Sequence, residues 1–370
     1  HVLPVDDRAE GRRPDRHVRG TRGNPLIIPS NTPASASRLG RRSLLSAAVA
    51  AAVVPRLARA AGPPYRIAFA NVNDTPGARV EGLGFTGADV RRGFELAARS
   101  LPVEMLYYDN AGDGETAVDN AVDAANRKVD LLIEYNADTS ANPEIARRMA
   151  AAGIPVLAIN YPIGDAPVYT CDNLAAGRIA GHAVGAFAKE SWPDDAVATA
   201  VLGDVGDPSD AVTQRLKGVK EALGAEYPGV EPALLDTGGQ PQRGDGLLTK
   251  YLAQQSRSKV LVVTLDDPTA LWARTAVETT RRVNDCAIVS HGLDRSIHGG
   301  ANEKKELDPS NRASAVLGSV AYYCDRYGYL VLPLALRMLK GETVPPHTVT
   351  KHVLVTAMTV YKEYPPYDMN

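Results

Sequence analysis

From residue 65 onward, short apolar runs alternate with longer segments in which apolar residues recur at helical spacing. The short runs predict strands at 66–72, 103–108, 129–135, 154–160, 196–202, 233–236, 260–265 and 287–293. The longer segments predict helices at 87–100, 115–128, 143–152, 175–189, 209–223, 247–255 and 269–283. This alternation is typical of α/β proteins, in which parallel sheets carry helices on both faces.

Polar residues follow almost every predicted strand. They are Asn71, Asn73, Asp74, Asn136, Asp138, Asn160, Tyr161, Asp204, Asp207, Asp266, Asp267 and Asp294. In an open parallel sheet, ligands bind outside the carboxyl ends of the strands. Any single Asn or Asp at such a place is equally well a helix cap or a turn residue. As a set, these residues predict a polar cleft rich in hydrogen-bond acceptors.

The segment 40–62, "GRRSLLSAAVAAAVVPRLARAAG", has the order of an export signal: positive residues, a short apolar stretch and a small-x-small site. Its apolar stretch, 44–54, is too short for a bilayer span, which takes about 20 residues. We expect cleavage after Ala60, and Arg41-Arg42 resembles a twin-arginine signal. An ordinary secretion signal or an amphipathic helix remains the alternative.

Charge is distributed unevenly along the chain. Residues 1–60 contain 11 of the 41 Lys and Arg but only 4 of the 43 Asp and Glu, so the remainder carries a net charge of about −9. An acidic body without a basic cluster argues against nucleic acid and anionic membranes as partners. The three cysteines, Cys171, Cys286 and Cys324, form no metal-binding spacing, and at most one disulfide is possible among them.

Catalytic motifs are absent from the sequence. It contains no G-x-S-x-G, no phosphate-binding loop and no H-E-x-x-H. The stretch 109–114, "DNAGDG", begins like a calcium loop, but Asn120 stands where that loop needs a glutamate, so we interpret it as a turn. Asp266-Asp267 is a candidate carboxylate pair for hydrolysis, without a nearby nucleophile. We expect no catalytic residue, metal or organic cofactor.

Three stretches resemble the type I periplasmic sugar-binding proteins of ABC importers, the ribose-binding-protein-like class. The first is "AAAGIPVLAIN" at 150–160 with "VYTCDNLAAGRIAGHAVGAF" at 168–187. The second is "VVTLDDPTALWA" at 262–273, followed by "SHGLD" at 290–294. The third is "VLGSVAYYCDRYGYLVLPLALRMLKGETVPP" at 316–346. Together they indicate a resemblance over most of residues 65–357.

The resemblance implies two Rossmann-like lobes with parallel sheets, joined by a three-segment hinge. The N-terminal lobe is expected at 61–173 plus about 300–325, and the C-terminal lobe at 174–299 plus about 326–350, with 351–370 as a C-terminal segment. The hinge crossings are expected near 173–180, 301–320 and 348–355.

The resemblance also implies a set of ligand-binding positions. They are Asn73, Asp74, Phe85, Asn136, Asn160, Tyr161, Arg215, Asp266, Asp267, Asp294 and Tyr322. Many members carry an arginine two residues before the position of Arg215, where this chain has Thr213, so Arg215 either replaces that arginine or forms a surface ion pair. Carboxylates, amides and aromatic rings at these positions suit a sugar or polyol.

The expected function is therefore binding of a sugar or polyol in the periplasm by a monomer whose lobes close around it. The closed form would then deliver the ligand to an ABC permease in the inner membrane. Two alternatives remain open at this point. One is an exported sugar sensor that contacts a receptor, and the other is an exported carbohydrate-active enzyme.

Overall fold

The structure is a computed structural model that describes residues 64–299, 305–311 and 313–365. The predicted export signal lies outside the described residues. All eight predicted strands coincide with observed strands to within about two residues at each end.

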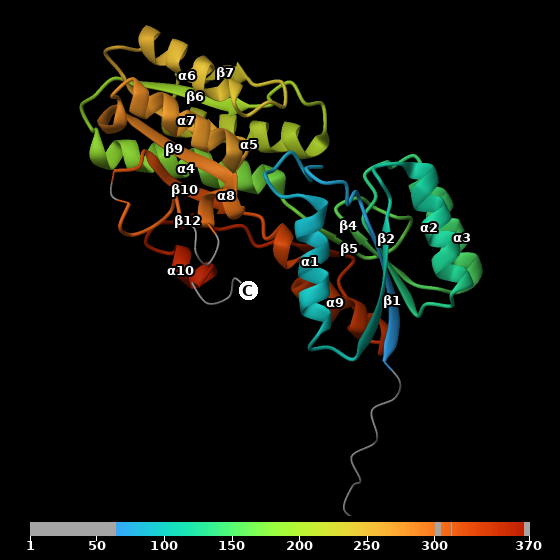
Figure 1. Ribbon diagram of the computed structural model, residues 1–370. Helices are drawn as coiled ribbons and strands as arrows, with labels where there is room; N and C mark the ends of the chain where they lie inside the picture. The colour runs from blue at the N-terminus through green and yellow to red at the C-terminus, as the bar shows by residue number, and fades with distance from the viewer. Residues whose placement is uncertain (1–63, 300–304, 312, 366–370) are drawn as a thin grey trace, which may run out of the picture. The chain divides into compact units, whose positions relative to one another are not determined.

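The first sheet has the strand order β11-β5-β4-β3-β1-β2, and its neighbouring strands are parallel. Its strands are β1 (Tyr65–Asn71), β2 (Val103–Asp109), β3 (Leu131–Glu134), β4 (Val156–Ile159), β5 (Val168–Thr170) and β11 (His347–Val349). Helices α1 (Gly87–Ala98) and α9 (Tyr327–Leu339) lie on one face, and α2 (Gly114–Asn126) and α3 (Asn142–Ala152) on the other (Figure 1).

The second sheet has the order β12-β10-β9-β8-β6-β7 and is parallel except for β12 against β10. Its strands are β6 (Val197–Gly203), β7 (Ala233–Asp236), β8 (Lys259–Thr264), β9 (Cys286–Gly292), β10 (Val316–Ala321) and β12 (Leu354–Thr356). Its helices are α4 (Asn173–Ser191), α5 (Asp210–Glu226), α6 (Arg243–Gln254), α7 (Asp267–Thr279), α8 (Arg295–His298) and α10 (Val360–Glu363), with short 3-10 turns at Val283–Asp285 and Cys324–Arg326.

Alternate residues of the central strands enter different hydrophobic clusters, as expected where both faces of a sheet are covered. In β8, Leu261 and Val263 belong to the cluster that includes α4 and α5, whereas Val260 and Val262 face the cluster of α6 and α7. The first of these clusters also contains residues of α1 and α9, so one apolar core runs through both lobes.

The two C-terminal segments belong to the opposite lobes from those expected. Residues 316–321, expected in the N-terminal lobe, form β10 beside β9 in the second sheet. Helix α9 and β11, expected in the C-terminal lobe, belong with the first sheet. For α9 the physical reason is its close packing on α1, because a Cβ on Gly328 would lie only 2.4 Å from the Gly93 carbonyl oxygen. The chain therefore crosses between lobes after β5, after β10 and after β11.

Candidate functional site

The loop after β1 folds into a hairpin, residues 78–87, at the carboxyl ends of the strands. The Val80 amide donates to the Phe85 carbonyl at 3.0 Å, and the Leu83 amide donates to the Val80 carbonyl at 3.0 Å. Glu81 and Gly82 have φ values of 57° and 61°, which define a turn of type I′. Glutamate is unusual at this position because the left-handed region costs a residue with a Cβ about 1–2 kcal/mol. Such strain persists where the surrounding structure fixes it, often at a functional site.

Arg215 on α5 holds the turn of this hairpin. Its side chain is fully buried, and its guanidinium donates to the carbonyls of Glu81 at 2.8 Å, Gly82 at 3.3 Å and Leu265 at 2.8 Å. It also donates to the Tyr322 hydroxyl and to the side-chain oxygen of Asn173. Arg215 is therefore a buried cross-lobe residue and not a surface ion pair.

The Glu81 carboxylate faces the N-terminal lobe. It accepts hydrogen bonds from the Tyr135 hydroxyl at 2.5 Å and from the Asn160 side-chain amide at 2.9 Å. Burial, followed by the nearby charge of Glu81, raises the pKa of Tyr161, whose hydroxyl also bonds to Glu81. Two predicted binding residues, Asn160 and Tyr161, thus converge on one carboxylate.

Asp266 and Asp267 are neighbours in the chain but have different surroundings. Asp266 caps α7, accepting from the Thr269 amide at 2.9 Å and the Thr269 hydroxyl at 2.7 Å, and it lies 3.8 Å from Arg79. Asp267 is fully buried and accepts from Ser290, from Ser319 at 2.7 Å and from the Asp294 amide at 2.7 Å. Burial raises the pKa of both carboxyls, and for Asp267 the charge of Asp294 adds to the increase.

Asp294 is the predicted residue with an unused acceptor. Its Oδ1 accepts from the Ser296 amide at 2.7 Å, whereas its Oδ2 has no hydrogen-bond partner within the described residues. The side chain is only 3% exposed, and burial raises its pKa to about 6. Gly84 of the hairpin covers this oxygen so closely that an added Cβ would lie 1.6 Å from it. A buried acceptor without a donor is rare and indicates a missing partner.

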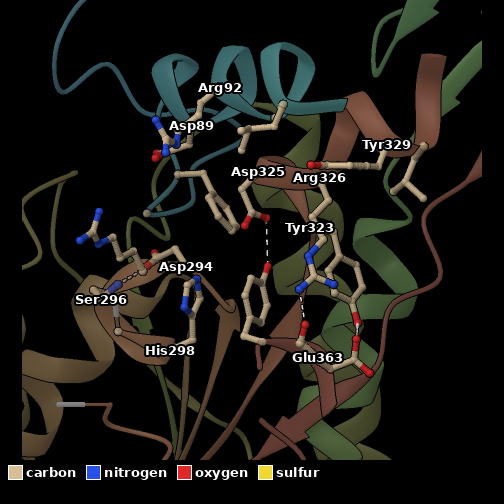
Figure 2. A pocket seen from close by; sticks show the side chains of 18 of the residues that line it. Asp89, Arg92, Asp294, Ser296, His298, Tyr323, Asp325, Arg326, Tyr329 and Glu363 are labelled. Atoms are coloured by element: carbon tan, nitrogen blue, oxygen red, sulfur yellow. Dashed lines mark hydrogen bonds between the residues drawn. The ribbon is translucent and has the colours of Figure 1, made fainter. Parts of the chain in front are cut away.

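Two cavities flank the hairpin. The larger one, of about 1080 Å³, is lined by residues of α1, α8, α9 and the segment around Tyr364, with Gly84, Phe85 and Asp294 in its wall. In Figure 2, Asp294 and His298 lie on one side of it and Asp325 and Arg326 on the other. The smaller one, of about 250 Å³, is lined by Arg79, Gly82, Asp204, Asp207, Thr237, Gly239, Pro241 and Asp266.

The other predicted residues are bound into local structure. Asn73 accepts from the Thr75 amide, and Asp74 pairs with Arg91 on α1 and accepts from Asn71. Asn136 is buried and donates to the Asn142 side chain and the Asp138 carbonyl. These contacts are typical of turn residues and caps, and none of them is with Glu81.

The sequence interpretation missed the residues of the hairpin that enter the cleft, Arg79, Glu81 and Gly84. It also missed His298, whose ring stacks on Tyr364 and whose Nδ1 has no partner within the described residues. Burial lowers the pKa of His298 to about 4. One signal was available for the hairpin, because apolar Val80, Leu83 and Phe85 are unusual in an exposed loop, and all three are buried.

The described part of the chain contains no cluster of three or more His, Cys, Asp or Glu side chains arranged to hold a metal ion. Cys171, Cys286 and Cys324 are free thiols. Among the described helices, none is long and apolar enough to cross a membrane.

A family model described as a periplasmic binding protein domain matches residues 84–343. The chain belongs to this family. The match includes most strands of both sheets, α5 with Arg215 and the strand tips with Asp266 and Asp294. The comparison with curated proteins found no match.

Solved structures of solute-binding proteins share the fold at low sequence identity. A solute-binding protein of an ABC transporter from Actinobacillus succinogenes with bound D-allose is 17% identical, with a TM-score of 0.62 over 81% of this chain and 100% of that one. One from Bacillus halodurans with bound myo-inositol is 18% identical, with a TM-score of 0.59 over 83% and 100%. The glucose-galactose binding protein GanP from Geobacillus stearothermophilus is 18% identical, with a TM-score of 0.56 over 82% and 99%.

Proposed function

We propose that the protein is a periplasmic solute-binding protein that binds a sugar or polyol between its lobes and delivers it to an ABC importer. The observation that carries the proposal is Asp294, a buried carboxylate in a cavity wall with one oxygen unpaired within the described residues. Family membership supports the binding role, and D-allose and myo-inositol are the ligands of two proteins with this fold.

The chemistry of the cleft favours a neutral polyhydroxylated ligand. Asp294 in the wall of the larger cavity and Asp266 in the wall of the smaller one are acceptors for ligand hydroxyl groups, and Arg79 beside Asp266 is a donor to them. Phe85 in the wall of the larger cavity offers a ring for the apolar face of a sugar. The carboxylates of the smaller cavity, Asp204, Asp207 and Asp266, disfavour a phosphorylated or acidic ligand there.

Delivery requires two states of the lobes. The chain crosses between the sheets at three places, which is the connectivity of a hinge-bending protein. Closure around a ligand would create the surface that a permease recognises, and a monomer is sufficient for it. Export by the predicted signal is part of the proposal, and replacing Arg41 and Arg42 with lysine should retain the precursor in the cytoplasm if the twin-arginine pathway is used.

A thermal-shift panel of sugars and polyols tests the binding role on protein from residue 61 onward. A ligand at 100 times its Kd stabilises the native state by about 2.7 kcal/mol, which raises the melting temperature by several degrees. Asp294→Asn should lose most of the shift, and the matched control is Asp138→Asn, whose exposed turn lies outside the cavities. Equal melting-temperature shifts in the wild type, Asp294→Asn and Asp138→Asn would exclude Asp294 from the site. An absence of any shift in the wild type would contradict the proposal.

A further inference from the structure

The hairpin 78–87 makes contacts in the cleft that resemble those of a polar ligand. Its Glu81 carboxylate accepts from Tyr135 and Asn160 of the N-terminal lobe. Its carbonyls at Glu81 and Gly82 accept from Arg215 of the C-terminal lobe. A short piece of the chain thus links donors of both lobes, as a bound sugar would.

The fit of the hairpin is incomplete at Asp294. Gly84 covers the carboxylate but brings no donor to its Oδ2, which has no partner within the described residues. A ligand hydroxyl in the larger cavity can donate to this oxygen of Asp294. The hairpin therefore satisfies the donors of the site better than it satisfies this acceptor.

The backbone of the hairpin has few hydrogen bonds to the body of the protein. At the turn they are internal, as between Val80 and Phe85, or come from Arg215. At the base, Asn71 donates to the Gly87 carbonyl, and Thr86 bonds through its amide and carbonyl to the first turn of α1. The residues that lead into it include exposed Gly77, which has a φ of 82° and no atom within 4 Å of an added Cβ. Val80, Leu83 and Phe85 are buried in the apolar core and Thr86 caps α1, so the part of the hairpin that can leave the cleft with β1 and α1 folded is the turn around Glu81 and Gly82.

We propose that the turn of hairpin 78–87 is an internal occupant of the cleft, with Glu81 in the position of the ligand, and that a sugar or polyol must displace this turn to bind. This inference rests on the proposed function and adds a competing state to it. The apparent affinity is then the intrinsic affinity multiplied by the fraction of molecules in which the hairpin is out.

The first experiment needs no ligand. Hydrogen exchange of residues 78–87 is compared in the wild type, Glu81→Ala and the control Glu95→Ala, which removes an exposed glutamate of α1 paired with Arg91. We expect at least tenfold faster exchange of the Val80 and Leu83 amides in Glu81→Ala and no change in the control. Equally fast exchange in the wild type would show that the hairpin does not occupy the cleft, and the inference would be wrong.

The second experiment tests displacement with D-allose, D-galactose and myo-inositol as probes. Glu81→Ala should bind at least one probe about tenfold more tightly than the wild type does, because the competitor is weakened. A tenfold loss would instead make Glu81 a ligand-contacting residue and overturn the inference.

A disulfide that holds the hairpin in the cleft should have the opposite effect to Glu81→Ala. An ideal Cβ on Gly82 lies 2.8 Å from the Val212 side chain, so Gly82→Cys with Val212→Cys places two thiols for a disulfide between hairpin and α5. The oxidised form should lose probe binding, and reduction of the same protein should restore it. Equal binding by both forms would refute displacement while leaving the proposed function intact. If no probe binds to any variant, including Glu81→Ala, the proposed function fails and the inference with it.

Discussion

The strand tips of the two lobes carry the same residue types but use them differently. In the N-terminal lobe, Asn73, Asp74 and Asn136 bond to their own turns or to the adjacent helix. In the C-terminal lobe, Asp266 and Asp294 also cap helices, yet both line cavities, and Asp294 retains an oxygen unpaired within the described residues. The difference teaches that capping and ligand binding are not exclusive, because the cap at Asp294 uses only one of the two carboxylate oxygens.

Arg215 connects the two lobes, and removing it should have the largest effect. Arg215→Ala leaves the carbonyls of Glu81 and Leu265 and the Tyr322 hydroxyl without their donor in a buried place. We expect a loss of about 3 kcal/mol or more in the free energy of unfolding, measured by denaturant titration.

Arg178→Ala is the control for this variant, since Arg178 pairs with Glu221 at the surface and should cost about 0.5 kcal/mol. A similar small loss for Arg215→Ala would mean that the lobes do not depend on this contact.

Asp294 should make stability depend on pH with a definite sign. Its folded pKa of about 6 is above the ordinary 3.8, so the folded state binds the proton more tightly than the unfolded state. The resulting stability is fully present below pH 3.8 and is lost as the pH rises through about 6.

Unfolding titrations of the ligand-free protein at several pH values check this prediction. Asp294→Asn, which does not titrate, should lose less stability than the wild type between about pH 4 and pH 7. Parallel curves for the two proteins would show that the carboxyl of Asp294 is solvated in the ligand-free state.

Asp267 tests whether the neighbour of a cleft residue is structural. Asp267→Ala leaves Ser290, Ser319 and the Asp294 amide without their common acceptor. We expect a loss of about 2 kcal/mol in unfolding free energy. Asp266→Ala, the adjacent control, should cost about 1 kcal/mol as a lost cap. A larger loss of unfolding free energy for Asp266→Ala than for Asp267→Ala would contradict the structural role assigned to Asp267.

Periodicity predicted the α/β fold well because buried apolar strands alternate along the chain with helices that bury one face. The strands that it missed include β5, β11 and β12, which have three residues each, too few to show a pattern. The exchange of β10 and α9 between lobes was not predictable from periodicity, because both segments are apolar. Their lobes follow from contacts with other elements, the pairing of β10 with β9 and the packing of Gly328 in α9 against Gly93 in α1.

The site was predicted only in part, because sequence patterns show local properties and miss contacts between distant segments. Strand-tip position identified Asp266 and Asp294, since the end of a strand is a local property. Strand-tip position could not distinguish Asp266 from Asp267, because adjacent side chains at the start of a helix point in different directions. Glu81 was missed because its place in the cleft depends on the hairpin and on Arg215, which is 134 residues away in the sequence.

Asp74 offers the smallest expected effect and the clearest test of the N-terminal tips. Its side chain is 15% exposed and pairs with Arg91, which is 33% exposed. Asp74→Asn should therefore cost no more than about 1 kcal/mol of stability, because solvent screens a pair of this kind. Ligand affinity should stay within about twofold of the wild type in the same thermal-shift panel, since the contacts of Asp74 are with Arg91 and Asn71 and not with either cavity. A tenfold loss of affinity with unchanged stability would place Asp74 in the ligand site, and the distinction between the strand tips of the two lobes would no longer hold.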